Sequence, residues 1–185
     1  MDKKSEPLVF VVKKHDATRL HYDFRLQVGK TMPSWAIPKG PSLDPSVKRL
    51  AMQVNDHDLE YRHFEGIIAE GNYGAGTVMI WDEGTYVPEV EISIGKREPI
   101  EDKKAAEKIM REGLEKGEIK FQLFGQKLKG SFALVKTRGF GPKNSWLLIK
   151  HKDEFVKAGY DANDYDFSAP TSRTLAEISQ ADTKP

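Results

Sequence analysis

One stretch decides the fold: Leu20-His21-Tyr22-Asp23-Phe24-Arg25-Leu26-Gln27-Val28, in which apolar and polar side chains alternate without a break. Successive side chains of a β-strand point to opposite faces, so a strand here turns its leucines and aromatic residues toward a core. His21, Asp23 and Arg25 then share the other face, and Gly29-Lys30 follows as a turn. The stretch therefore predicts a strand with one buried face and one face of titratable side chains.

Shorter segments of the same kind recur along the chain, and a few helical signals lie between them. Strands are predicted at residues 9–12, 34–37, 49–54, 76–81, 119–124, 131–135 and 146–150. A helix is predicted at residues 101–116, where acidic residues come first and Lys116-Gly117 ends the pattern, and a short helix at 174–180. This order predicts a mainly β fold, a small antiparallel β-barrel with one or two flanking helices.

The length of 185 residues fits one domain. We expect a short polar N-terminal arm at residues 1–8, the barrel at 9–158 and a polar C-terminal tail at 159–185 that runs along the surface. The absence of cysteine excludes a disulfide framework, a zinc finger and a thiol nucleophile. No long apolar run and no signal-peptide core occur, so we expect a cytoplasmic protein with no membrane partner. We also expect it to be a monomer.

The net charge of +1 conceals alternating blocks. Residues 9–49 carry a net +5 and residues 95–152 a net +8, whereas residues 50–94 carry −8 and residues 153–185 carry −4. Two basic blocks suit a phosphate-binding surface if the fold brings them together. The alternative is an ordinary solvated surface of mixed charge.

A metal site is predicted where two strands meet. If residues 16–19 form a hairpin loop, His15 returns beside the start of the next strand, close to His21 and Asp23. Two imidazoles and one carboxylate favour Mn, Fe, Zn, Co or Ni over the oxygen-liganded Ca and Mg. The alternative is that these residues are ordinary polar side chains on an exposed sheet face.

A phosphate-binding cluster is predicted beside this site. The apolar side chains of residues 49–54 are expected to face the core, which leaves Arg49 on the polar face with Arg25. Two guanidinium groups would hold a phosphate, and His57 and Tyr61 in the following loop would approach it. The alternatives are a loop histidine, a core tyrosine and a surface ion-pair partner for Arg49.

A glycine-rich segment, residues 65–78, is predicted to be a loop that shapes one wall of a pocket. It is not a Walker loop, because Gly76 is not followed by Lys and Ser or Thr. Glu65 and Glu70 are candidates for carboxylates behind the metal ligands.

Several motifs, in this order, resemble the 3′-phosphoesterase domain of DNA ligase D, a family that includes stand-alone members. The motifs are His15 to Leu26, Trp35-Ala36-Ile37-Pro38-Lys39-Gly40-Pro41-Ser42, Lys48-Arg49-Leu50-Ala51, and Glu65-Gly66 through Glu70-Gly71-Asn72-Tyr73-Gly74. The resemblance covers about residues 9–150 and implies a small β-barrel that repairs DNA 3′ ends with Mn²⁺, or with Co²⁺, Zn²⁺ or another divalent transition metal. Such enzymes remove a 3′-terminal ribonucleoside from a primer–template and then the remaining 3′-phosphate, which leaves a 3′-OH.

The resemblance also implies roles for individual residues. It assigns His15, His21 and Asp23 as metal ligands and Arg25 and Arg49 as phosphate-holding arginines. His57 would contact the scissile phosphate, and Tyr61 matches an active-site tyrosine.

One departure from the family pattern lies at the N-terminus. The family often has a longer polar arm with an Arg-Asp pair and a Glu, of which Glu6 is the sole plausible counterpart here. We expect this to weaken the ribonucleoside-removing step more than the phosphatase step. We also expect a ligase or polymerase partner to act in trans.

Two other function classes remain open at this point. A non-haem Fe(II) oxygenase would need a distant second histidine, for which His151 is the candidate, but position 161 is Asp where an arginine is expected. A non-catalytic nucleic-acid-binding barrel would use Tyr22, Phe24 and Trp35 as exposed stacking platforms.

Overall fold

The computed structural model describes residues 6–139 and 141–181. Its strands are β1 (Leu8–Asp16), β2 (Leu20–Leu26), β3 (Thr31–Ile37), β4 (Lys48–Asp58), β5 (Gly66–Ile68), β6 (Gly76–Ser93), β7 (Lys96–Pro99), β8 (Glu118–Gly125), β9 (Lys129–Lys136) and β10 (Ser145–Lys150). Its helices are the 3₁₀ turns η1 (Leu59–His63) and η2 (Ala162–Tyr165) and the α-helices α1 (Lys103–Lys116) and α2 (Leu175–Ala181).

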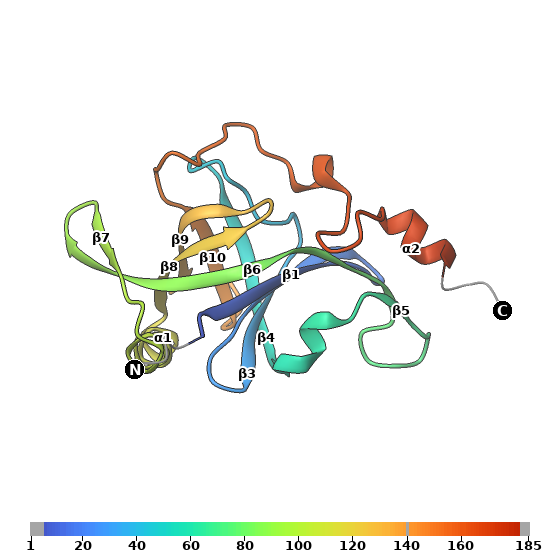
Figure 1. The fold of residues 1–185 in the computed structure, drawn as a ribbon, viewed down its shortest axis with the longest axis horizontal. Helices are drawn as coiled ribbons and strands as arrows, with labels where there is room; N and C mark the ends of the chain where they lie inside the picture. Colours follow the sequence, from blue (N-terminus) through green and yellow to red (C-terminus); the bar gives the residue numbers. More distant parts are fainter. Residues whose placement is uncertain (1–5, 140, 182–185) are drawn as a thin grey trace.

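The sheet closes on itself. Hydrogen bonds join the strands in the order β1-β2-β3-β4-β10-β9-β8-β6, and β6 also pairs with β1, so eight antiparallel strands form a ring (Figure 1). The long strand β6 carries two short partners outside this ring, β5 near its start and β7 near its end. The predicted mainly β, antiparallel fold is confirmed, with a barrel-like arrangement of the sheet.

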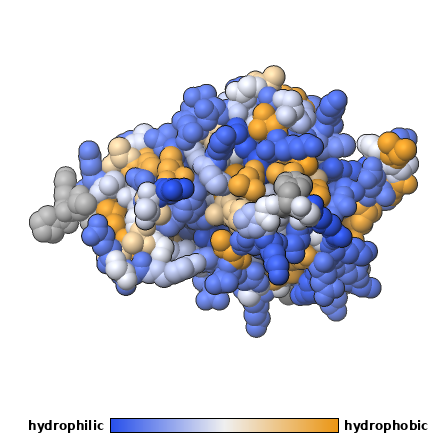
Figure 2. All heavy atoms as spheres, turned by 180° about the vertical axis from the view of Figure 1, so that it is seen from behind, coloured by the Kyte–Doolittle hydropathy of each residue, from blue (hydrophilic) through white to orange (hydrophobic). Residues whose placement is uncertain are grey.

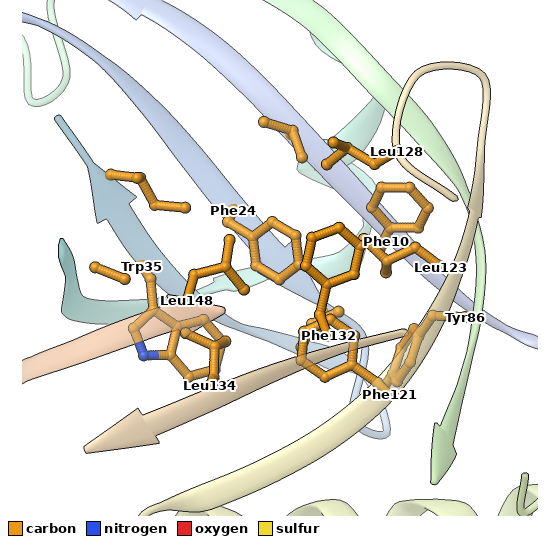
Figure 3. Close-up of a cluster of buried hydrophobic side chains, with 14 of the residues drawn as sticks. Phe10, Phe24, Trp35, Tyr86, Phe121, Leu123, Leu128, Phe132, Leu134 and Leu148 are labelled. Carbon is orange, nitrogen blue, oxygen red and sulfur yellow. The ribbon is translucent and has the colours of Figure 1, made fainter. Parts of the chain in front are cut away.

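The inside of the ring is filled by large apolar side chains, which Figure 3 shows converging from opposite strands. Phe24 from β2 and Trp35 from β3 have no exposed surface, and Trp35 meets Trp146 edge to face at 5.6 Å between ring centroids. Burial of this much aromatic surface is the main stabilising contribution in such a fold. Tyr22, Phe24 and Trp35 are therefore core residues, and the exposed stacking role considered for them is wrong.

Helix α1 follows its predicted range closely. The Asp102 side chain caps its start by accepting a hydrogen bond from the Ala105 N–H at 3.0 Å. Gly117 ends it in the left-handed conformation at φ 86°, and its N–H donates to the Gly113 carbonyl. Figure 1 shows α1 and α2 at opposite ends of the molecule.

The segment after residue 159 contributes to the core, although it was expected to run along the surface. Tyr160, Ala162 and Ile178 are buried in the main apolar cluster. Helix α2 confirms the short helix predicted at 174–180, and the Arg173 guanidinium holds the Glu65 carboxylate at 3.0 Å. This segment is thus fastened to β6 and to the loop before β5.

The outside of the ring is mostly polar. Figure 2 shows hydrophilic side chains over much of one face, with apolar patches between them. A small second cluster, formed by Val11, Met32 and Ile80, is buried on the outer side of the sheet and supports the site described below. None of the helices in the described part of the chain is both long and apolar enough to cross a bilayer.

Candidate functional site

The first half of the site is the hairpin of β1 and β2. The two strands pair in a register that sets His15 opposite His21 and Lys13 opposite Asp23. Paired residues of an antiparallel ladder share a face, so all four side chains lie on the outer side of the ring. The predicted return of His15 to the start of the next strand is confirmed.

The two imidazoles and the carboxylate converge. His15 Nδ1 lies 3.4 Å from Asp23 Oδ2, and His21 Nε2 lies 3.2 Å from Asp23 Oδ1. The imidazole centroids are 4.8 Å apart, and one ligand atom from each residue lies within 4.8 Å of the others. Among the residues that the structure describes, this is the group whose side chains are placed to share a metal ion.

Backbone carbonyls orient both rings. The Nε2 atom of His15 lies 3.3 Å from the Ala75 carbonyl oxygen, and Nδ1 of His21 lies 3.0 Å from that of Arg19. A carbonyl only accepts, so these nitrogens carry the protons, and the opposite nitrogens face Asp23. This is the arrangement in which metal-binding histidines are held by their other N–H.

Asp23 and His21 shift each other's pKa. Hydrogen bonding to Asp23 raises the pKa of His21, which favours its protonated form. Burial by itself would raise the pKa of Asp23, but the hydrogen bonds from His15 and His21 and the charge of Arg25 outweigh it. The pKa of Asp23 is therefore held well below its usual range, and the carboxylate is ionised at neutral pH.

Arg25 connects this cluster to His57. Its Nη2 lies 3.6 Å from Asp23 Oδ2, and its Nη1 donates to Ser34 Oγ at 2.9 Å and to His57 Nδ1 at 2.8 Å. His57 Nδ1 also lies 3.1 Å from the Asn55 carbonyl oxygen, so this nitrogen faces both a group that only donates and a group that only accepts. Burial and the charge of Arg25 both lower the pKa of His57, which favours the neutral imidazole.

A β-bulge brings His57 to this face. Ser34 pairs with Val54, but Met32, two residues earlier, pairs with His57, three residues later. The extra residue in β4 reverses the alternation after Val54, so His57 lies on the same side as Val54 and Ser34. Without it, His57 would point to the interior side of the ring.

The predicted facing of residues 49–54 is wrong. Ala51 is fully buried in the core, and Gln53 Oε1 accepts a hydrogen bond from Trp146 Nε1 at 3.1 Å, whereas Leu50 is 46% exposed. Arg49 alternates with Ala51 and Gln53 and so lies on the inner face of β4. The structure therefore does not bring it to Arg25, which lies on the outer face. The sequence misled because the buried position of this strand carries a small residue and the outer position a leucine.

Lys13 belongs to the site but was not predicted. Only 1% of it is exposed, and its ammonium donates to the Tyr61 carbonyl at 2.9 Å and to the Phe64 carbonyl. It thereby fixes η1, which carries Tyr61 to within 5.7 Å of His57 between ring centroids. Burial, followed by the charge of Arg25, lowers the pKa of Lys13 to about 7. The sequence could have predicted this, because Lys13 and His15 are two residues apart and side chains at that spacing in a strand share a face.

These side chains line one cavity of about 430 Å³. The glycine-rich segment forms one wall of it through Tyr73 and Gly74, as predicted. The cavity is lined by Lys13, His15, Ala17, His21, Asp23, Arg25, Ala36, Val54, His57, Tyr61, Ile68, Tyr73, Gly74 and Val78.

Other candidates lie elsewhere. Neither Glu65 nor Glu70 lines the cavity. Glu65 accepts hydrogen bonds from the Ile80 N–H and from Arg173, and Glu70 is exposed. Glu6 is exposed beside α1, and the rest of the predicted arm, residues 1–5, lies outside the described residues. His151 directly follows β10. Burial, followed by the charge of Arg97, lowers the pKa of its imidazole.

Comparisons with known proteins agree on one family. A family model described as the DNA Ligase D 3′-phosphoesterase domain matches residues 13–136. The multifunctional non-homologous end joining protein LigD of Pseudomonas aeruginosa is 49% identical over 146 residues, which are 79% of this chain and 15% of that protein.

Two mycobacterial relatives match a similar region. The multifunctional non-homologous end joining DNA repair protein LigD of Mycobacterium tuberculosis is 37% identical over 145 residues, covering 78% of this chain and 16% of that protein. The LigD protein of Mycolicibacterium smegmatis is 36% identical over 145 residues, covering 78% and 17% respectively. The chain thus spans about a sixth of the length of the curated relatives it matches.

Proposed function

Because the chain belongs to the DNA ligase D 3′-phosphoesterase family, we propose that it is a metal-dependent phosphoesterase acting on DNA 3′ ends. It removes a 3′-terminal ribonucleoside and a 3′-phosphate from primer ends and leaves a 3′-OH. The observation that carries the proposal is the convergence of His15, His21 and Asp23 beside Arg25 in one cavity.

The donor set suits a divalent transition metal. His15 Nδ1, His21 Nε2 and the Asp23 carboxylate would hold it, and both rings are already oriented by carbonyls on their far side. Two nitrogens and a carboxylate favour Mn²⁺, Co²⁺ or Zn²⁺ over Ca²⁺, and the family resemblance selects Mn²⁺. A cation bound there would polarise a phosphate oxygen and lower the pKa of a water molecule.

The protein side chains supply the remaining charge and hydrogen bonds. Arg25 is buried with its guanidinium between Asp23 and His57, so it would face a phosphate seated at the ligands and stabilise negative charge that grows on its oxygens. His57 would form a hydrogen bond with the same group. Lys13, whose pKa is lowered to about 7, adds an amino group to the cavity wall and fixes the backbone of η1.

The two rival classes have less support. A nucleic-acid-binding barrel would require the aromatic residues of β2 and β3 to be exposed, and they are buried. An oxygenase would require His151 beside His21 and Asp23, but the residues lining the cavity do not include it.

The names of the relatives suggest the biological setting. The names refer to non-homologous end joining and DNA repair, and together with the family resemblance they support primer–template 3′ ends as substrate and a ligase or polymerase as partner. Because the chain spans a small share of those proteins, their other activities are not assigned to it.

The test is release of phosphate from a primer with a 3′-phosphate, measured with a panel of divalent cations. We expect turnover to depend on Mn²⁺ or a similar cation and to be lost in His21→Ala and Asp23→Ala. His63→Ala is a matched control, because His63 is an exposed residue of η1 that does not line the cavity. Wild-type turnover in the two ligand variants, or turnover after chelation, would overturn the proposal.

A further inference from the structure

A second cavity adjoins the first. It has a volume of about 380 Å³ and is lined by Asn55, Asp56, His57, Asp58, Tyr61 and Tyr73. Tyr61, Tyr73 and His57 line both cavities, so these three side chains form the boundary between them. A substrate group that leaves the first cavity across this boundary enters the second.

The two cavities differ in charge. The first is lined by Lys13 and Arg25 beside the single carboxylate of Asp23, whereas the described residues that line the second include two aspartates and neither lysine nor arginine. Asp58 stands at the N-cap of η1, yet its side chain makes no capping hydrogen bond, so its acceptor atoms remain available to a ligand. Carboxylates repel phosphate and accept hydrogen bonds from hydroxyl and amino groups.

The boundary also offers aromatic surface. Tyr73 is 82% exposed. The Tyr61 ring is stacked on Phe64 at 5.6 Å and is thereby held in place at the same boundary. Exposed aromatic rings bind nucleobases by stacking, largely irrespective of base identity.

We propose that the second cavity binds the terminal nucleoside, while the first holds the phosphate that joins it to the primer. This rests on the proposed function and specifies where the leaving group lies. In the reaction, a water oxygen bonds to phosphorus, the bond from phosphorus to the nucleoside O5′ breaks, and a proton from the water ends on O5′. The primer keeps a 3′-phosphate and the nucleoside leaves uncharged, which suits an acidic, aromatic cavity.

A 3′-phosphate primer has no such nucleoside and does not use the second cavity. The double variant Asp56→Asn/Asp58→Asn should therefore lower kcat/KM for ribonucleoside removal about tenfold, as expected for weakened hydrogen bonds to charged acceptors. Release of a 3′-phosphate should be unchanged. Asp164→Asn, an exposed aspartate of η2, is the matched control. Equal loss on both substrates, or loss on neither, would overturn the inference.

Binding of adenosine separates this inference from the proposed function. Chemical shifts in the wild-type protein should respond to adenosine around Tyr73 and Asp58, and the double variant should bind it several-fold more weakly. Absence of adenosine binding overturns the cavity assignment. If adenosine binds but neither primer is processed, the assignment of the cavity stands and the proposed function fails.

Discussion

Replacing Gly76 by alanine should separate the ligand-bearing hairpin from β6. Gly76 begins β6 at φ 128°, and a Cβ there would lie 2.1 Å from the Asp16 carbonyl oxygen and 3.1 Å from Ala17 Cα. The first atom belongs to the last residue of β1, and the second belongs to the loop of the β1–β2 hairpin. The close backbone contact that glycine permits is therefore one of the constraints that hold His15 in place.

The cost has two parts. The backbone conformation costs an alanine about 1–2 kcal/mol. Overlap with the Asp16 carbonyl adds about 1–3 kcal/mol, because backbone atoms must move to relieve it. Gly71→Ala is the control for a positive φ without overlap, since Gly71 has φ 87° and a Cβ there would meet nothing within 4 Å. In a chain of this size 1 kcal/mol lowers Tm by about 2–4 °C.

The assay is thermal unfolding of both variants, combined with Mn²⁺ titration calorimetry. Gly76→Ala should have a Tm about 2–12 °C below that of Gly71→Ala, which is the overlap cost converted to temperature. It should also bind Mn²⁺ more weakly, whereas Gly71→Ala should keep wild-type affinity. Equal Tm values and equal metal affinities would show that the contact at Gly76 does not position the hairpin.

Three further outcomes follow from the site. His57→Ala should reduce phosphate release at least about 100-fold, the usual range for a group that assists proton transfer, while calorimetry finds unchanged metal affinity; loss of the metal would instead make His57 a ligand. Asp23 has a lowered pKa in the folded state, so its stabilising contribution is present above its ordinary pKa of 3.8 and is lost as the pH falls below it. In urea unfolding between pH 2 and 6, Asp23→Asn should lack this acid-sensitive part, and an unchanged pH profile would contradict it. The pKa of Lys13 is about 7 in the folded protein against an ordinary 10.5, so between these values the unfolded chain binds more protons and stability rises with pH. Lys13→Met should show a smaller rise over this interval in the same measurement, and a rise equal to that of the wild type would show that Lys13 titrates normally.

The metal half of the site follows from local sequence. Alternation along residues 20–28 fixes which face each side chain takes, and a three-residue loop between β1 and β2 fixes the register that pairs His15 with His21. Both features depend on neighbouring residues. Helix α1 was equally accessible, because Asp102 and Gly117 mark its ends in the sequence.

The rest of the fold depends on contacts between distant segments. Strand β6 is 18 residues long and continues well beyond residue 81, where the predicted strand ends. It does so because β1, β5, β7 and β8 each pair with part of it. The segment after residue 159 has a polar sequence, yet Tyr160 and Ile178 are buried in the core that the closed ring provides. Few apolar residues suffice to anchor a segment when each one is fully buried.

The phosphate half was harder to predict because a bulge is not visible in an alternating pattern. Arg49 and His57 are separated by an even number of residues, so a regular strand would place both on one face. Because of the extra residue between Val54 and His57, Arg49 and His57 lie on opposite faces. The His57 side chain therefore points toward Arg25. The two halves of the site thus depend on different devices, a tight hairpin for the metal ligands and a bulge plus the Lys13-anchored η1 turn for His57 and Tyr61. Substitutions that disturb β4 or η1 should therefore impair phosphate chemistry while metal binding persists, whereas those in the hairpin should abolish both.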